Sequence, residues 1–166
     1  MVNVAYIDGQ NLYLWTKADW RFVDFKRLRI FLKDKFNVEE AYYFIGFVSE
    51  EEQALYNNLQ KAGFIVVFRE HSATLKGKKK GNVDVDIVFE IMKKIYEEKD
   101  FDKIVLVTGD GDYIKLVKHL IKKNLLHKVV FPNKNYSSLY NSIGNSFYYC
   151  LLEAKRKIEH NKKRGS

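Results

Sequence analysis

Aspartates directly follow two short apolar runs of the sequence. Asp8 follows Val4–Ile7, and Asp110 and Asp112 follow Ile104–Val107 within the run Thr-Gly-Asp-Gly-Asp. Apolar runs of this length are typical of buried strands in a parallel sheet. Ligands of open α/β sheets bind beyond the carboxyl ends of the strands, where the strand order reverses. We therefore expect Asp8 and Asp110 to project from the same edge of one sheet.

A third aspartate, Asp84, lies at the start of a helix predicted over residues 83–97. At 100° per residue it shares a stripe with the apolar residues Ile87, Val88, Ile91 and Ile95. Asp86 lies on the opposite, polar side, so we expect it to face solvent. A carboxylate on the buried stripe needs a partner, because an unpaired buried charge is costly. Asp84 is therefore either a first-turn capping residue, favoured there by the helix dipole, or a ligand beside Asp8 and Asp110.

The other acids also have purely structural interpretations. Asp8 precedes Gly9, and Asp-Gly is a common turn dipeptide. Asp112 would serve as the N-cap of a helix predicted from Tyr113. The glycines in both motifs are expected to let the backbone turn sharply and to leave room for a ligand.

Carboxylates gathered at one point repel each other unless they are protonated or neutralised by a cation. Mg²⁺ and Mn²⁺ prefer oxygen ligands, lower the pKa of bound water and stabilise charge on a phosphate under attack. The sequence has a single cysteine, Cys150, and four histidines without ligand-like spacing, which argues against zinc and against a disulfide framework. The expected cofactor is therefore Mg²⁺ or Mn²⁺.

Strands alternate with helices along the chain. Strands are predicted at 4–7, 41–48, 64–68, 104–107 and 128–131, and helices at 24–36, 49–62, 83–97 and 113–123. Helix 49–62 begins at a Ser49–Glu52 capping box and ends at Gly63. A short helix near Ser137, an aromatic stretch at 147–149 and a basic terminal helix follow. This order predicts an α/β fold, a three-layer α/β/α sandwich around a mainly parallel sheet of five or six strands.

The composition places the chain among globular proteins. Its 166 residues suit one domain, and 46% of them are hydrophobic. No apolar run approaches the roughly 20 residues needed to cross a bilayer, and the first residues lack the features of a secretory signal. A cytoplasmic location without a membrane partner is expected.

The charge of the chain favours a polyanionic partner. The formal net charge is +8 and the sequence pI is about 9.4, as in many proteins that bind nucleic acid. Basic residues concentrate in a tail from Lys155 and in one loop cluster, which consists of Lys76, Lys78, Lys79 and Lys80. The loop is either a solvated surface segment or a grip for phosphates.

Three segments, in this order, resemble the NYN domains of the PIN-like nuclease superfamily, in the LabA-like branch. They are Tyr-Ile-Asp-Gly-Gln-Asn-Leu at 6–12, Lys-Gly-Asn-Val-Asp-Val at 80–85, and Leu-Val-Thr-Gly-Asp-Gly-Asp-Tyr at 106–113. The resemblance implies a PIN-like sheet, an acidic Mg²⁺ or Mn²⁺ site, and hydrolysis of phosphodiester bonds, usually in RNA. It implies an NYN domain over residues 1–150, followed by a basic helix or tail at 151–166.

The resemblance also implies roles for individual residues. The family's metal-holding acids match Asp8, Asp84, Asp110 and Asp112. Asn11 matches an asparagine whose amide is suited to orient Asp8 or a phosphate. Thr108 and Ser138 fall where the family often has small hydroxyl residues.

This sequence departs from the family pattern in the segment around Asp84. Asn82 is inserted before Val83, Glu90 stands where an aspartate is common, and Asp86 stands where a small residue is usual. Asp86 is therefore a secondary site candidate, and Thr108, at the family's hydroxyl position, is another.

The expected activity is metal-assisted in-line hydrolysis of single-stranded or structured RNA. In this scheme Asp8, Asp84 and Asp110 hold one ion, and Asp112 helps to position that ion, a second ion or the attacking water. Tyr13, Trp15 and Trp20 either stack on unpaired bases or pack in the core.

Two alternatives come from other classes. One is a nucleic-acid-binding module without catalysis. The other is a haloacid-dehalogenase-like phosphatase, in which Gln10 would occupy the position that usually carries a second acid. A homodimer and a further protein partner both remain open.

Overall fold

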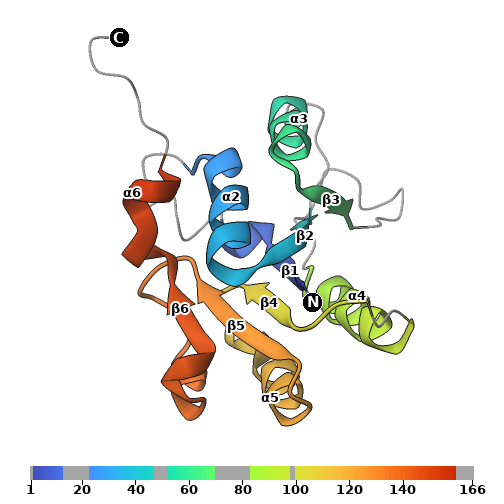
Figure 1. Cartoon of the computed structure of the whole chain (residues 1–166), viewed down its shortest axis with the longest axis vertical. Helices are drawn as coiled ribbons and strands as arrows, with labels where there is room; N and C mark the ends of the chain where they lie inside the picture. The colour runs from blue at the N-terminus through green and yellow to red at the C-terminus, as the bar shows by residue number, and fades with distance from the viewer. Residues whose placement is uncertain (1, 13–22, 47–51, 70–82, 98–99, 160–166) are drawn as a thin grey trace.

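Six parallel strands form one sheet in the part of the chain that the computed structural model describes, which is residues 2–12, 23–46, 52–69, 83–97 and 100–159. The strand order is β3-β2-β1-β4-β5-β6 (Figure 1). The strands are β1 (Asn3–Asp8), β2 (Val38–Ile45), β3 (Ile65–Phe68), β4 (Ile104–Val107), β5 (Leu126–Phe131) and β6 (Tyr148–Cys150). After β1 the chain adds β2 and β3 on one side of it. It then crosses to β4 on the other side of β1 and continues to β5 and β6. The order therefore reverses between β1 and β4, the two central strands.

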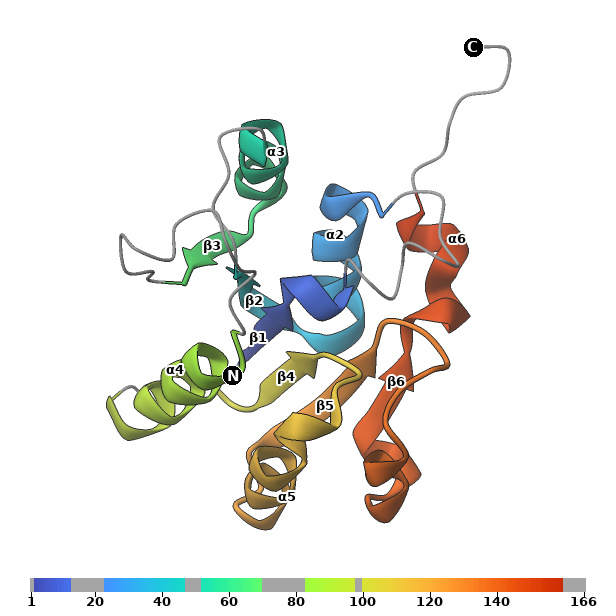
Figure 2. The same ribbon diagram turned by 180° about the vertical axis from the view of Figure 1, so that it is seen from behind.

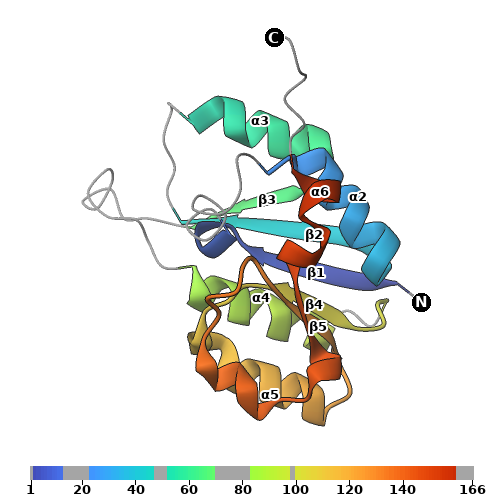
Figure 3. The ribbon, with the colours of Figure 1, turned by 90° about the vertical axis from the view of Figure 1, so that its left-hand side faces the viewer.

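Helices cover both faces of the sheet, so the predicted three-layer sandwich is confirmed. On one face lie α2 (Phe25–Phe36), α3 (Gln53–Ala62) and α6 (Lys155–Ile158); on the other lie α4 (Asp84–Glu97) and α5 (Ile114–Lys122). Figure 3 shows the sheet edge-on between the two layers, and Figure 2 shows the arrangement from behind. In Figure 3 the carboxyl end of β1 and the first turn of α4 lie at the same edge of the sheet.

The central strands alternate their side chains between two cores. Ala5 and Ile7 of β1 pack with α2, α3 and α6, whereas Val4 and Tyr6 pack with α4 and α5. Every residue of β1 and β4 is buried, as expected for strands covered on both faces. This explains why both strands read as continuous apolar runs.

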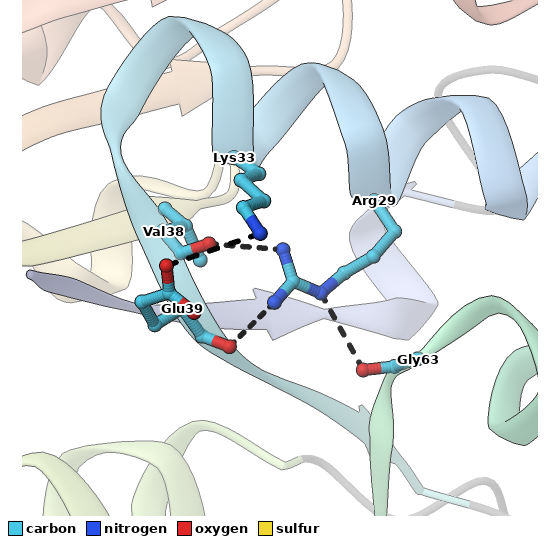
Figure 4. A network of polar contacts seen from close by, with 5 residues as sticks. All are labelled: Arg29, Lys33, Val38, Glu39 and Gly63. Atoms are coloured by element: carbon cyan, nitrogen blue, oxygen red, sulfur yellow. Dashed lines mark hydrogen bonds and ion pairs between the residues drawn. The ribbon is translucent and has the colours of Figure 1, made fainter.

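Arg29 connects α2 with the start of β2 and with the end of α3 (Figure 4). Its guanidinium donates hydrogen bonds to the carbonyl oxygens of Val38 at 3.0 Å, Glu39 at 2.5 Å and Gly63 at 3.4 Å. Lys33, one turn further along α2, forms an ion pair with the Glu39 carboxylate at 4.0 Å. These contacts fix the start of β2 and the end of α3 against α2.

Most predicted elements are confirmed, with three differences. β2 begins at Val38 instead of residue 41, and β6 is a strand that the aromatic stretch at 147–149 did not predict. The predicted capping box at the start of α3 is wrong in its described part: Glu52 makes no capping hydrogen bond and the helix begins at Gln53. Ser49 lies outside the described residues. Gly63 ends α3 with a φ of 99°, as predicted.

The described part of the C-terminal segment packs against the rest of the fold. Leu151, Ala154 and Ile158 are buried in the core beneath α2. The backbone of Asp24 donates a hydrogen bond to Ile158 O at 3.0 Å. No helix in the described ranges is both long and apolar enough to span a membrane.

Candidate metal centre

Asp8 ends β1 and turns its carboxylate into the protein. The residue is only 3% exposed. Its Oδ1 accepts a hydrogen bond from the Asn11 backbone N–H at 3.1 Å, and its Oδ2 accepts one from Thr108 Oγ1 at 3.3 Å. Residues 9–12 are helical, so the contact with Asn11 has the geometry of a helix N-cap. The carboxylate is thus fixed by β1 and by the residue that follows β4.

Asp110 follows β4 and caps the short 3-10 helix Gly111–Tyr113. Its Oδ1 accepts a hydrogen bond from the Asp112 backbone N–H at 2.9 Å. Its own backbone N–H donates to Thr108 Oγ1 at 3.2 Å, and its carbonyl accepts from the Tyr140 hydroxyl at 2.5 Å. The fully buried Thr108 therefore contacts both Asp8 and Asp110.

Asp84, the first residue of α4, reaches the same place from the third segment. The Tyr113 hydroxyl lies 2.8 Å from Asp84 Oδ1, to which it donates, and 3.3 Å from Asp8 Oδ2. Tyr113 is only 1% exposed. The predicted helical phase of Asp84 is confirmed, because Ile87 and Ile91 of the same stripe are buried.

The three carboxylates converge. Asp8, Asp84 and Asp110 each offer one oxygen, and these oxygens all lie within 4.8 Å of one another. Such an all-oxygen, anionic donor set fits a hard divalent cation. The strand ends predicted the meeting of Asp8 and Asp110, and of the two interpretations left open for Asp84 the position beside them is the one observed.

The electrostatics of the cluster also fit a cation. Burial, with a smaller contribution from the charge of Asp84, raises the pKa of Asp8 from 3.8 to about 6. The hydrogen bonds from Asn11, Thr108 and Tyr113 oppose this rise in pKa without cancelling it. Burial and the nearby carboxylates also raise the pKa of Tyr113 and of Tyr140, so both hydroxyls stay protonated. A bound cation would neutralise the repulsion among the carboxylates of Asp8, Asp84 and Asp110.

Asn11 joins the two central motifs. Its side-chain Oδ1 accepts a hydrogen bond from the Gly109 backbone N–H at 2.8 Å, while its own N–H bonds Asp8. The predicted neighbourhood of Asn11 and Asp8 is therefore present. The contact to Asp8 is made by the backbone of Asn11, and its amide oxygen holds the loop after β4.

Asp112 and Asp86 behave differently from the sequence-based expectations. Asp112 is exposed and is not among the three clustered acids, and the N-cap expected from it is provided by Asp110. Asp86 does not simply face solvent: it is half-buried, and its Oδ2 is buried without a hydrogen-bond partner in the described chain. Asp86 lies on the flank of α4, beside an outer face that carries the exposed Val85 and Phe89.

The glycines serve close packing more than sharp turning. A Cβ on Gly9 would lie 2.5 Å from the Phe44 carbonyl oxygen, and one on Gly111 would lie 2.4 Å from Ser137 Oγ. Neither glycine has a positive φ; among the described glycines only Gly63 does. The turns at these two positions therefore need the small size of glycine and not a left-handed backbone conformation.

The other predicted site residues lie outside the described residues or at the surface of the protein. The loop Lys76–Lys80 and the aromatic residues Tyr13, Trp15 and Trp20 lie outside the described residues. Ser138 is exposed, and the neighbouring Ser137 caps the 3-10 helix Ser138–Ser142 and packs on Gly111. Sequence reasoning assigned no role to Tyr113, although this tyrosine ends the Gly-Asp-Gly-Asp-Tyr motif.

Comparisons with known proteins agree with this geometry. The family model described as the NYN domain matches residues 3–150. The low amplitude and bright protein LabA of Synechococcus elongatus is 24% identical over 127 residues, which cover 71% of this chain and 67% of LabA. A solved structure of a Vibrio parahaemolyticus protein of unknown function superposes with a TM-score of 0.72 at 21% identity, covering 90% of this chain and 91% of that one. The last similarity concerns the fold alone.

The raised pKa of Asp8 makes the metal-free protein sensitive to pH. Stability from a neutral Asp8 is fully present below pH 4 and is lost as the pH rises through about 6, because the folded state must then bury the charge. A shift of this size is worth about 3 kcal/mol. About one third of this stability is already lost at pH 4.5, so Asp8→Asn should gain about 2 kcal/mol of unfolding free energy over the wild type between pH 4.5 and 7.5.

This difference can be measured by urea unfolding in EDTA at both pH values. Asp34→Asn is the matched control, since Asp34 is exposed on α2. Parallel stability profiles for wild type and Asp8→Asn would show that Asp8 has an ordinary pKa.

The Tyr113 hydroxyl should position Asp8 and Asp84 for a cation. Loss of groups that orient metal ligands typically costs 10–100-fold in metal affinity. We expect Tyr113→Phe to weaken Mn²⁺ binding by about 10-fold or more in calorimetric titration. Tyr148→Phe, which removes a hydrogen bond to Asn145, is the control and should bind Mn²⁺ like the wild type. Equal affinity in both variants would remove the positioning role.

Proposed function

Because the chain belongs to the NYN domain family, we propose that it is a metal-dependent nuclease that hydrolyses RNA phosphodiester bonds at the Asp8–Asp84–Asp110 centre. The observation that carries the proposal is the convergence of these three carboxylates at the carboxyl edge of the sheet, within 4.8 Å of one another. They lie where the strand order reverses, the usual ligand position in such sheets.

The cofactor we propose is Mg²⁺ or Mn²⁺, held by Asp8, Asp84 and Asp110. When bound, such an ion supplies a water of lowered pKa and stabilises charge on the phosphate. The protein's own contribution is preorganisation. Thr108 and Asn11 hold Asp8 and the loop after β4 in register, and Tyr113 holds Asp8 beside Asp84.

The exposed Asp112 takes a different part in this proposal. It follows Asp110 by two residues on the solvent side of the centre. From there its carboxylate is suited to orient the attacking water or to accept a proton from it. Asp112 is thus proposed to act on the reacting groups, and not as a member of the buried ligand set.

RNA is the proposed substrate because of the charge of the chain. The net charge of +8 attracts a polyanion, despite the acidic centre. Lys76, Lys78, Lys79 and Lys80 precede Asp84 by a few residues in the sequence, and we propose that they bind phosphates. Lys115, in the first turn of α5, and Lys134, just after β5, are exposed and follow strand ends at the same edge. We place the activity in the cytoplasm.

The test is cleavage of single-stranded and hairpin RNA with Mg²⁺, Mn²⁺ or EDTA. We expect cleavage with either ion and none in EDTA. The Asp8→Asn plus Asp110→Asn double variant should lose at least about 100-fold in rate, because several kcal/mol of charge stabilisation disappear. Asp34→Asn should cleave like the wild type.

The same experiment separates the alternatives. RNA binding without cleavage under every metal condition would indicate a non-catalytic binding module. Hydrolysis of p-nitrophenyl phosphate without RNA cleavage would indicate a phosphatase. Either result, or cleavage that persists in the double variant, contradicts the proposal.

A further inference from the structure

The outer face of α4 carries an exposed apolar stripe. Its members, which we call the α4 stripe, are Val85, Phe89, Met92 and Tyr96, with exposed fractions of 78%, 61%, 38% and 86%. They point away from the sheet, since the buried residues of the same helix are Ile87 and Ile91. Half of the eight large hydrophobic residues exposed in the described chain lie in this one stripe. Such concentration is typical of an interaction surface.

The spacing of the stripe indicates what kind of partner fits it. The residues follow one another at intervals of four, three and four, which is the spacing of the a and d positions of a coiled coil. A seam of this kind packs against another helix. Along one side of the stripe three acids, Asp86, Glu90 and Glu97, outnumber the single base Lys93, so the surface disfavours RNA.

We propose that the α4 stripe is a dimer interface, on which α4 of a second copy of this chain packs antiparallel. The two-fold axis would cross the helix pair between Phe89 and Met92. Phe89 then faces Met92 of the second copy, and Val85 faces Tyr96 of the second copy. The small and the large side chain are matched at each end of the seam, as a self-complementary interface requires.

The charges beside the stripe select this antiparallel orientation. Asp86 and Lys93 occupy equivalent flanking positions on the same side, one heptad apart. Antiparallel pairing brings Asp86 of each copy to Lys93 of the other. Parallel pairing instead sets Lys93 against the apolar Val88.

The size of the seam limits the strength of the dimer. Stable interfaces of standard size bury about 1,200–2,000 Å² in total. One pair of helices of 14 residues offers less than this, although it includes two aromatic side chains from each copy. We therefore expect a reversible dimer with a dissociation constant on the order of 10 µM.

The antiparallel arrangement would place the interface next to the candidate metal centres of both copies. Asp84 is the first residue of α4, so antiparallel pairing sets the two Asp84 residues near opposite ends of the helix pair. Thirteen residues at 1.5 Å each separate them by about 20 Å along the helix axis. Two acidic centres would then flank one α4 pair, whether or not the centre is a nuclease site.

Sedimentation velocity of the full chain from 1 to 300 µM tests the interface. The chain mass is 19.6 kDa, so the wild type should move from monomer towards twice that mass as concentration rises. Phe89→Glu and Tyr96→Glu should each remain monomeric throughout. Ile30→Glu is the matched control: Ile30 is 50% exposed on α2, on the opposite face of the sheet, and its variant should dimerise like the wild type.

A charge reversal tests the orientation. Lys93→Glu places two like-charged pairs in the antiparallel seam and should weaken dimerisation at least 10-fold. Lys118→Glu makes the same change in net charge at an exposed position of α5 and should leave dimerisation unaltered. A wild type that stays monomeric at 300 µM, or dimers that survive Phe89→Glu, overturn the interface. Equal dimerisation by Lys93→Glu and Lys118→Glu overturns the antiparallel pairing.

Discussion

Asp8 has a carboxylate that the fold removes almost entirely from water, and two further carboxylates lie beside it. Burying this carboxylate costs free energy, and the neighbouring groups of the centre partly offset that cost with hydrogen bonds. Thr108, the backbone of Asn11 and the Tyr113 hydroxyl each offer the Asp8 carboxylate a hydrogen bond, yet its pKa still rises to about 6. A protein that only needed a stable core would place an apolar residue here. The buried carboxylate therefore supports the proposed cation site.

The topology brings these groups together without any unusual backbone. Because the order reverses between β1 and β4, the residues after both strands meet at one edge, and α4 delivers Asp84 to the same edge. The sequence predicted this much, since apolar runs mark the two strands and a 3.6-residue period marks the inner face of α4. Asp8 and Asp110 could thus be placed at one edge from the sequence, whereas for Asp84 the helical period predicted only the face of the helix and left capping and ligation open.

Other features could not be predicted, for physical reasons. Tyr113 reads as an ordinary first-turn aromatic residue, because only the tertiary fold carries its hydroxyl between Asp8 and Asp84. The N-cap function of Asp110, in place of Asp112, depends on one turn of 3-10 helix that residue types do not specify. Asp86 could not be predicted correctly, because the helical phase of a residue gives only the direction of its side chain. How far the side chain is buried depends on the neighbouring elements, which the phase does not give. The edge strand β6 has three residues, too few for a period-two pattern.

Crystals grown with Mn²⁺ test the central claim most directly, by anomalous scattering measured on both sides of the manganese absorption edge. If the three carboxylates form a metal centre, an anomalous peak will lie among them, in contact with one oxygen each from Asp8, Asp84 and Asp110. A map without a peak at this position, at Mn²⁺ concentrations that label other acidic groups, would contradict the assignment of this centre as a metal site.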